Sequence, residues 1–202
     1  MGESATDADL IVASLRDPQE FGRLFDRHGR AVHRYVGSRA RRADVDDVVS
    51  ETFVTAFHSR SRYDRTYDDA RPWLLGIATN VLRHHFRSEH RRLARQRAAP
   101  VAPETGVDIS EHVAATVDEV FETDRIGRAL DRLDDRHREV LLLAASADLT
   151  YEDIARALGI PVGTVRSRLA RGRRRLRELL VTGGQHEMDA NNVSPSSEGT
   201  LE

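Results

Sequence analysis

The chain has 202 residues, of which 39% are hydrophobic and 32% charged, and this length suits one domain or two small ones. It contains no cysteine, which excludes disulfides and thiolate metal sites and fits a reducing cytoplasm. No apolar run approaches the roughly 20 residues that cross a bilayer, and the N-terminus lacks the basic start and apolar core of a signal peptide. We therefore expect a cytoplasmic protein that does not insert into membranes.

The net charge of −2 hides an uneven distribution, and all 31 basic residues are arginine. Residues 83–97 contain six arginines and one acid, and residues 166–177 contain seven arginines and no acid. By contrast, residues 104–124 contain seven acids and no arginine. Because a phosphate backbone responds to the local sign of charge, the two basic segments indicate a nucleic-acid partner, with two solvated helix faces as the alternative.

Hydrophobic residues recur at helical spacing along the chain and no strand-like alternation persists, so we predict an all-α fold. The first dozen residues are small and polar. Asp17 is a candidate N-cap followed by Pro18, and the apolar face of the helix that follows includes Phe21 and Phe25. The predicted N-terminal helices and their turn-rich segment cover residues 17–36, 44–58 and 72–87, with the turns at 59–71. In the third helix, Trp73 lies on the apolar half, opposite a polar stripe that is cationic at one end.

Composition divides the chain into two helical domains, a linker and a tail. The linker is acidic and contains prolines, so we expect it to be flexible, and the tail is rich in Gly, Ser and Asn, which favours disorder. The predicted boundaries are 13–97 for the N-terminal domain, 98–123 for the linker, 124–181 for the C-terminal domain and 182–202 for the tail.

Residues 150–177, TYEDIARALGIPVGTVRSRLARGRRRLR, form the most informative motif. Thr150 and Asp153 make a variant of the capping box, and Gly159 is placed to end a short helix in the left-handed conformation. Pro161 then permits a new helix after a tight turn. This pattern predicts a helix-turn-helix.

The second helix of this motif has two contrasting faces. One narrow sector is apolar and is expected to pack on the domain; it contains Val165, Leu169, Gly172 and Leu176. The opposite sector carries Arg166, Ser167, Ala170, Arg171 and Arg174. Arginine side chains reach base edges and phosphates in the major groove, so we predict a DNA-reading helix.

Three segments carry a family resemblance. IPVGTVRSRLARGRRRLR, preceded by LDRLDDRHREVLLL, resembles the fourth conserved region of an extracytoplasmic-function (ECF) sigma factor of bacterial RNA polymerase. DVDDVVSETFVTAF resembles the family's helix that docks on the polymerase clamp, and RPWLLGIATNVLRHHFR resembles its promoter-melting helix. The resemblance covers residues 17–97 and 124–180. It implies a protein that directs core RNA polymerase to promoters and catalyses nothing itself.

The resemblance also implies partners and site residues. The partners are promoter DNA, the clamp helices of the polymerase β′ subunit, the flap of the β subunit and, in many family members, an anti-sigma factor. No cofactor and no metal is implied. The implied polymerase contacts are Asp47, Glu51 and Val54. The implied minus-ten contacts are Tyr63, Tyr67, Asn80, Arg83 and Arg87, and the implied minus-thirty-five contacts are Thr164, Arg166, Ser167, Ala170, Arg171 and Arg174.

Several of these assignments have alternatives. Asp47 and Glu51 also fit a plain solvated face, and Ser50 stands where the family usually has glutamine. Tyr63 and Tyr67 fit partial core packing nearly as well as base stacking.

Two other classes of function are weaker. A stand-alone helix-turn-helix regulator would need a sensory N-terminal domain, for which residues 17–97 give no sign. An enzyme acting on nucleic acid would need a metal site built from His84, His85 or His90 with nearby acids. However, His84 and His90 do not share a helical face, and neither has a carboxylate at ligand spacing.

Overall fold

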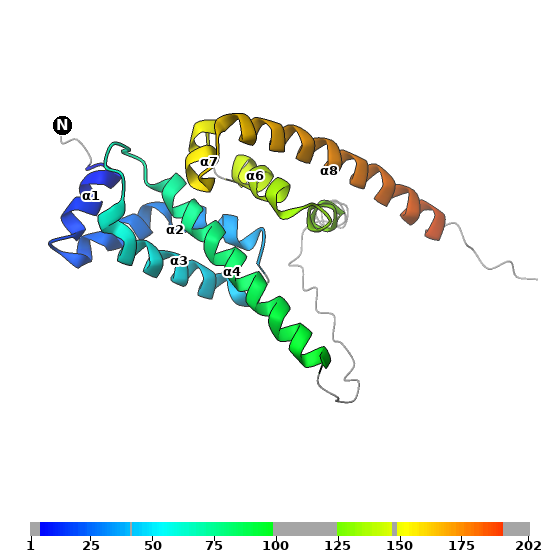
Figure 1. Ribbon diagram of the computed structural model, residues 1–202, viewed down its shortest axis with the longest axis horizontal. Helices are drawn as coiled ribbons and strands as arrows, with labels where there is room; N and C mark the ends of the chain where they lie inside the picture. Colours follow the sequence, from blue (N-terminus) through cyan, green and yellow to red (C-terminus); the bar gives the residue numbers. More distant parts are fainter. Residues whose placement is uncertain (1–4, 41, 99–124, 147–148, 192–202) are drawn as a thin grey trace, which may run out of the picture. The chain divides into compact units, whose positions relative to one another are not determined.

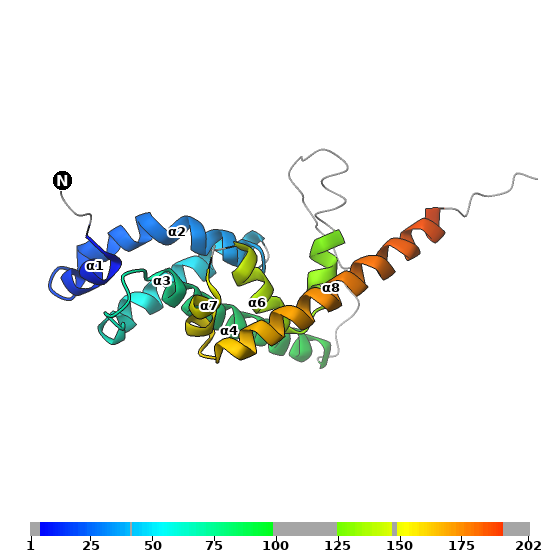
Figure 2. The same ribbon diagram turned by 90° about the horizontal axis from the view of Figure 1, so that it is seen from above.

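The computed structural model describes residues 5–40, 42–98, 125–146 and 149–191, and these form helices and turns without a strand (Figures 1 and 2). Most of the predicted linker and the last eleven residues lie outside the described part. No described helix is long and apolar enough to cross a membrane. The α-helices are α1 (Asp7–Ser14), α2 (Gly22–Gly37), α3 (Val45–Ser59), α4 (Arg71–Ala98), α6 (Asp135–Ser146), α7 (Tyr151–Leu158) and α8 (Val162–Asn191), and residues 125–131 are also helical.

The chain divides into two compact units. One comprises Met1–Thr105 and Glu139–Ser167, and the other comprises Gly106–Arg138 and Arg168–Glu202. In the first unit, α2, α3 and α4 pack against one another around a shared core (Figure 1). Large side chains with less than 2% exposure build that core, among them Leu24, Val32, Tyr35, Leu74, Leu75 and Leu82.

The N-terminal helix α1 corrects the sequence analysis, which placed no element in the first dozen residues. Thr6 and Asp9 form a reciprocal capping box, with the Asp9 N–H bonded to Thr6 Oγ1 at 3.1 Å and the Thr6 N–H bonded to Asp9 Oδ2 at 2.9 Å. Leu10 and Ile11 are buried, at 1% and 0% exposure. Two well-placed apolar residues and a cap thus anchor a helix in a segment whose composition is otherwise small and polar.

The α4 helix starts where predicted but continues eleven residues further, to Ala98. Its first half is buried against α2 and α3, and the Tyr35 hydroxyl lies 2.8 Å from Thr79 Oγ1 inside the core. Its second half is largely exposed and rich in arginine. Arginine is a good helix former, and the pair of Arg92 with Glu89 at 3.3 Å adds support one turn apart, so the helix continues past the end of its apolar stripe.

Within the first unit, α7 packs directly on α4. The contact is so close at Gly76 that a Cβ atom there would lie 2.4 Å from the backbone oxygen of Ala157. Gly76 is therefore required by a helix–helix approach that no other residue permits.

In the second unit, residues 125–131 form a helix, and a side chain donates hydrogen bonds to backbone oxygens at its C-terminal end. The Arg138 guanidinium donates hydrogen bonds to the backbone oxygens of Leu130, Asp131 and Leu133 at 2.8, 2.6 and 3.1 Å. These bonds occupy carbonyls that the helix itself leaves without partners. Asp134 then accepts the Arg136 N–H at 3.0 Å and caps the start of α6.

The helix-turn-helix forms as predicted. Thr150 and Asp153 make the capping box, and Gly159 ends α7 in the left-handed conformation with φ 63°. The helix that follows, α8, begins at Val162, directly after Pro161, and its backbone stays helical to Asn191. It therefore extends into the segment whose composition favours disorder.

Candidate functional site

The predicted polymerase-docking residues share an exposed face of α3. Asp47 and Glu51 are exposed and lie one turn apart, and Val54 is 56% exposed on the next turn. This face of α3 therefore combines two carboxylates with uncovered apolar area.

An apolar groove adjoins Val54. It runs between the start of α2 and the end of α3, and its walls include Pro18, Phe21, Phe25, Phe53 and Phe57. Phe25 is 50% exposed, although its spacing places it on the apolar face of its helix. Its ring packs edge-on against Phe53 with centroids 4.9 Å apart, so it borders the groove rather than filling the core.

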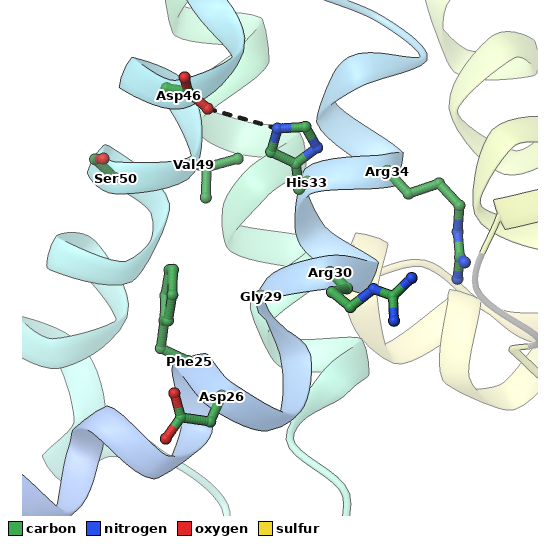
Figure 3. Close-up of a pocket in the computed structure, with 9 residues that line it drawn as sticks. All are labelled: Phe25, Asp26, Gly29, Arg30, His33, Arg34, Asp46, Val49 and Ser50. Carbon is green, nitrogen blue, oxygen red and sulfur yellow. Dashed lines mark ion pairs between the residues drawn. The ribbon is translucent and has the colours of Figure 1, made fainter.

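Phe25 also borders a second pocket, of about 650 Å³, between α2 and α3 (Figure 3). At its far end His33 of α2 lies 3.5 Å from an Asp46 carboxylate oxygen of α3. Val49 and Ser50 line the α3 side, and Arg30 lines the α2 side. The α2–α3 surface thus carries apolar, acidic and basic groups side by side.

In the turn-rich segment of residues 59–71, one of the two predicted minus-ten tyrosines is buried and the other is exposed. Tyr63 is 7% exposed, its ring packs against Trp73 with centroids 5.1 Å apart, and its hydroxyl donates to the Tyr67 carbonyl oxygen at 2.8 Å. Burial raises the pKa of Tyr63 to about 12. Tyr67 is 42% exposed, and the Arg156 guanidinium of α7 lies 3.7 Å from its ring centroid. For Tyr63 the geometry matches the packing alternative.

These residues line a pocket of about 460 Å³ where the segment before α4 meets α4 and α7. Asn80, from the predicted polar stripe of α4, lines the same pocket, so the structure brings three of the five predicted minus-ten residues together. Arg87 is exposed further along α4 and does not line it.

Arg83 is held by an acid that the sequence analysis did not single out. Its guanidinium donates to both carboxylate oxygens of Glu139 on α6, at 2.7 and 2.5 Å, and to Asn80 Oδ1 at 3.2 Å. Glu139 is 1% exposed, and Arg39 lies 3.7 Å away on its other side. The only hint in the sequence is a lone acid at the start of an apolar run, REVLLL.

The predicted minus-thirty-five face lies along α8. Five of the six predicted residues, Arg166, Ser167, Ala170, Arg171 and Arg174, are exposed, and on the opposite face Val165 and Leu169 are 0% and 2% exposed. Thr164 is half-buried and accepts a hydrogen bond from Ser167 Oγ to its backbone oxygen at 3.0 Å. Arg174 is exposed and lies 3.9 Å from Glu178.

Family comparisons identify these segments. The Sigma-70 region 2 model matches residues 24–92, and the Sigma-70, region 4 model matches residues 123–176. The RNA polymerase sigma factor NccH of Alcaligenes xylosoxydans xylosoxydans is 33% identical over 174 residues, which cover 83% of this chain and 90% of NccH. The ECF RNA polymerase sigma factor SigC of Mycobacterium tuberculosis is 34% identical over 178 residues, which cover 86% of this chain and 92% of SigC. The chain belongs to the ECF sigma factors.

As a sigma factor, the protein binds core RNA polymerase and directs transcription initiation to specific promoters, which confirms the predicted function over the stand-alone regulator. CnrH, solved in complex with the cytosolic domain of CnrY, is 28% identical with a TM-score of 0.64, covering 87% of this chain and 97% of CnrH. The sigma factor RpoE of Bartonella quintana, solved with the anti-sigma factor NepR, is 21% identical with a TM-score of 0.61, covering 80% and 97%. Both have the same fold, and the all-α prediction is confirmed.

The enzyme alternative rests on His84, His85 and His90. His85 lies 3.5 Å from Asp44, His84 is exposed, and the side chain of His90 is outside the described part. In the part of the chain that the structure describes, the single group of three residues able to share a metal ion is Asp7, His28 and Asp69.

Proposed function

We propose that the sigma factor divides its work among three surfaces: the α3 face docks on the β′ clamp helices, the 59–71 segment with α4 recognises the minus-ten element, and α8 reads minus-thirty-five. The observation that carries this proposal is the two-sided α8, with apolar residues buried along one face and arginines exposed along the other. Such a helix can anchor in its domain and still offer long donors to a major groove.

The α3 face supports docking through mixed chemistry. Asp47 and Glu51 offer two carboxylates to basic side chains of a partner, and Val54 with the neighbouring phenylalanine groove offers uncovered apolar area. Charge complementarity guides the encounter, and apolar contact at the centre of an interface supplies affinity. We therefore favour docking on the clamp helices over the alternative, in which this face contacts only solvent.

The minus-ten surface combines an accessible aromatic ring with polar donors. Tyr67 offers a partly exposed ring, on which a stacked base is worth about 1–3 kcal/mol. Asn80 lines the same pocket, and Arg83 and Arg87 continue the stripe along α4 with charge for the phosphate backbone. The Tyr63 hydroxyl donates a hydrogen bond to the Tyr67 backbone oxygen and so helps to fix the backbone that carries this ring.

We also propose where the protein acts and which further partners it binds. The chain acts in the cytoplasm with the β flap contacting its C-terminal domain, and the polymerase supplies the magnesium and the nucleotidyl transfer. CnrH was solved with the cytosolic domain of CnrY, and the Bartonella RpoE was solved with the anti-sigma factor NepR. We therefore propose that this sigma factor also binds an anti-sigma factor.

Run-off transcription with purified core polymerase on a promoter panel tests the proposal. Start-site-specific transcripts should require the sigma factor, and Arg171→Ala should reduce them while core binding persists. Glu51→Arg reverses one charge of the α3 face and should reduce core binding. The holoenzyme that still forms should keep the promoter preference of the wild type. Loss of core binding on Arg171→Ala, or normal core binding on Glu51→Arg, would contradict the assigned surfaces.

A further inference from the structure

Asp7, at the start of α1, is a buried acid with an unusual set of partners. It is 5% exposed. Its Oδ1 accepts a hydrogen bond from Arg27 Nη1 at 2.9 Å, and its Oδ2 lies 2.5 Å from His28 Nε2. Both partners come from α2, so this carboxylate fastens α1 to the first unit's core.

Asp7 also binds the end of the 59–71 segment, which is proposed to recognise the minus-ten element together with α4. The Ala70 N–H donates to Asp7 Oδ2 at 2.9 Å, and the Asp7 N–H donates to the Asp68 carbonyl oxygen at 3.1 Å. These two bonds hold the backbone on either side of Asp69, directly before α4 begins. The bond to Ala70 joins residues 63 positions apart, so it is a tertiary contact and not part of a local turn.

Most other bonds of this segment are internal to it. Asp64 accepts the Thr66 N–H at 3.1 Å and the Thr66 hydroxyl at 2.8 Å, and Tyr63 donates to the Tyr67 carbonyl oxygen at 2.8 Å. Internal bonds give the segment a shape but do not fix where it sits. Three contacts join the segment to the rest of the unit: the Tyr63 ring packs against Trp73, the Arg156 guanidinium lies over the Tyr67 ring, and Asp7 binds the Ala70 N–H.

A metal site is the main alternative for this cluster, since Asp7, His28 and Asp69 each present a ligand atom within 4.8 Å of one another. However, both Asp7 oxygens already accept protein donors, including a guanidinium and a backbone N–H. A cation would have to displace these bonds and would stand beside Arg27. The donors therefore favour a structural use of the carboxylate.

We propose that Asp7 is a positioning residue for promoter recognition: it couples α1 and α2 to the 68–70 backbone and thereby sets where Tyr67 meets the minus-ten strand. The inference rests on the proposed role of the 59–71 segment. It assigns to α1, which lies before the region matched by the Sigma-70 region 2 model, a part in reading DNA.

The test uses holoenzyme formed from core polymerase and full-length sigma factor. A pool of single-stranded DNA with a randomised segment is selected on wild-type holoenzyme, and 2-aminopurine scanning of the enriched motif locates the unstacked base. The same selection is then run with Asp7→Ala and with Asp7→Asn, which keeps one acceptor for the Ala70 N–H. Tyr35→Phe is the control, because it removes buried hydroxyl bonds to Thr79 and Arg39 in the same core without touching the segment.

Asp7→Ala should reduce preference at the unstacked position by roughly tenfold, the order expected for loss of one base stacked on an aromatic ring. Asp7→Asn should retain more of the preference, and Tyr35→Phe should leave it unchanged even where it lowers the yield of holoenzyme. An Asp7→Ala holoenzyme with undiminished preference overturns the inference, as does an equal loss in Tyr35→Phe. If wild-type holoenzyme enriches no motif with an unstacked base, the proposed minus-ten function fails instead.

Discussion

Glu139 of α6 binds the guanidinium of Arg83 on α4 through both carboxylate oxygens, at 2.7 and 2.5 Å. Glu139 is 1% exposed, and Arg39, whose side chain is also 1% exposed, lies on its other side. Because Arg83 is a proposed minus-ten contact, the pair matters for function as well as for stability. While Glu139 holds Arg83, the same donors are not offered to a phosphate.

The first prediction concerns Glu139→Gln. The substitution leaves Arg39 as a buried charge without its carboxylate, and breaking a buried pair in this way costs about 3–5 kcal/mol. We expect a lower free energy of unfolding in urea. We also expect tighter binding of a minus-ten single strand by free sigma factor in fluorescence anisotropy, because Arg83 is released. Glu152→Gln on α7 is exposed and makes the same charge change, so it controls for net charge. Unchanged anisotropy in Glu139→Gln would contradict the competition between Glu139 and DNA.

The second prediction concerns Gly76→Ala. Replacing glycine by alanine inside a helix usually stabilises it by about 0.5–1 kcal/mol. At Gly76 the added Cβ meets the Ala157 backbone oxygen at 2.4 Å, so α7 must shift away from α4 and the variant should be less stable. Gly127→Ala, where nothing lies within 4 Å of the added Cβ, should raise stability instead. Thermal unfolding of both variants measures the contrast, and a stabilised Gly76→Ala protein would show that the close approach does not persist in solution.

The third prediction concerns Arg171→Ala on α8. If Arg171 contacts a base pair, the variant should lose about 1–3 kcal/mol of discrimination at one position of the minus-thirty-five element. Arg177→Ala removes another exposed arginine outside the predicted contact set and should weaken binding similarly at every sequence, if at all. Holoenzyme binding to a panel of single-base promoter variants distinguishes the two. A uniform loss in Arg171→Ala would assign it to the phosphate backbone.

The fourth prediction is a pH dependence of stability. Burial raises the pKa of Asp7, but the hydrogen bonds to His28, Ala70 and Arg27 together lower it by more. The pKa therefore falls from 3.8 to about 2. A group whose pKa is lowered by folding stabilises the protein above its unfolded pKa and loses that contribution as pH falls.

The stability difference between wild type and Asp7→Asn should therefore be about 1–2 kcal/mol near neutral pH and should shrink between pH 4 and pH 2, as linkage requires. Urea unfolding of both proteins across this range measures the difference in the free energy of unfolding. Groups that titrate alike in both proteins do not contribute to this difference. A constant difference would mean that Asp7 is not stabilised in its charged form.

Local signals in the sequence determined much of this sigma factor. Thr150, Asp153 and Gly159 specify the helix-turn-helix because a cap and a left-handed glycine act within a single turn. The two faces of α8 follow from spacing alone, since helical periodicity sorts side chains by direction. The capping box of Thr6 and Asp9 is an equally local signal and could have predicted α1, although the small, polar composition of the segment argued against a helix.

Tertiary structure decided what those surfaces face. Periodicity placed Phe25 on an apolar stripe, but whether another element covers that stripe depends on packing, and here half of the ring stays exposed. Tyr63 is buried because its ring packs against Trp73, whereas the Tyr67 ring stays 42% exposed with the Arg156 guanidinium lying over it. Glu139 reaches Arg83 across 56 residues, and Asp7 reaches Ala70 across 63. Such pairs form because burial of the helix faces brings distant segments together, and a charged group taken out of water then needs whichever partner that packing supplies.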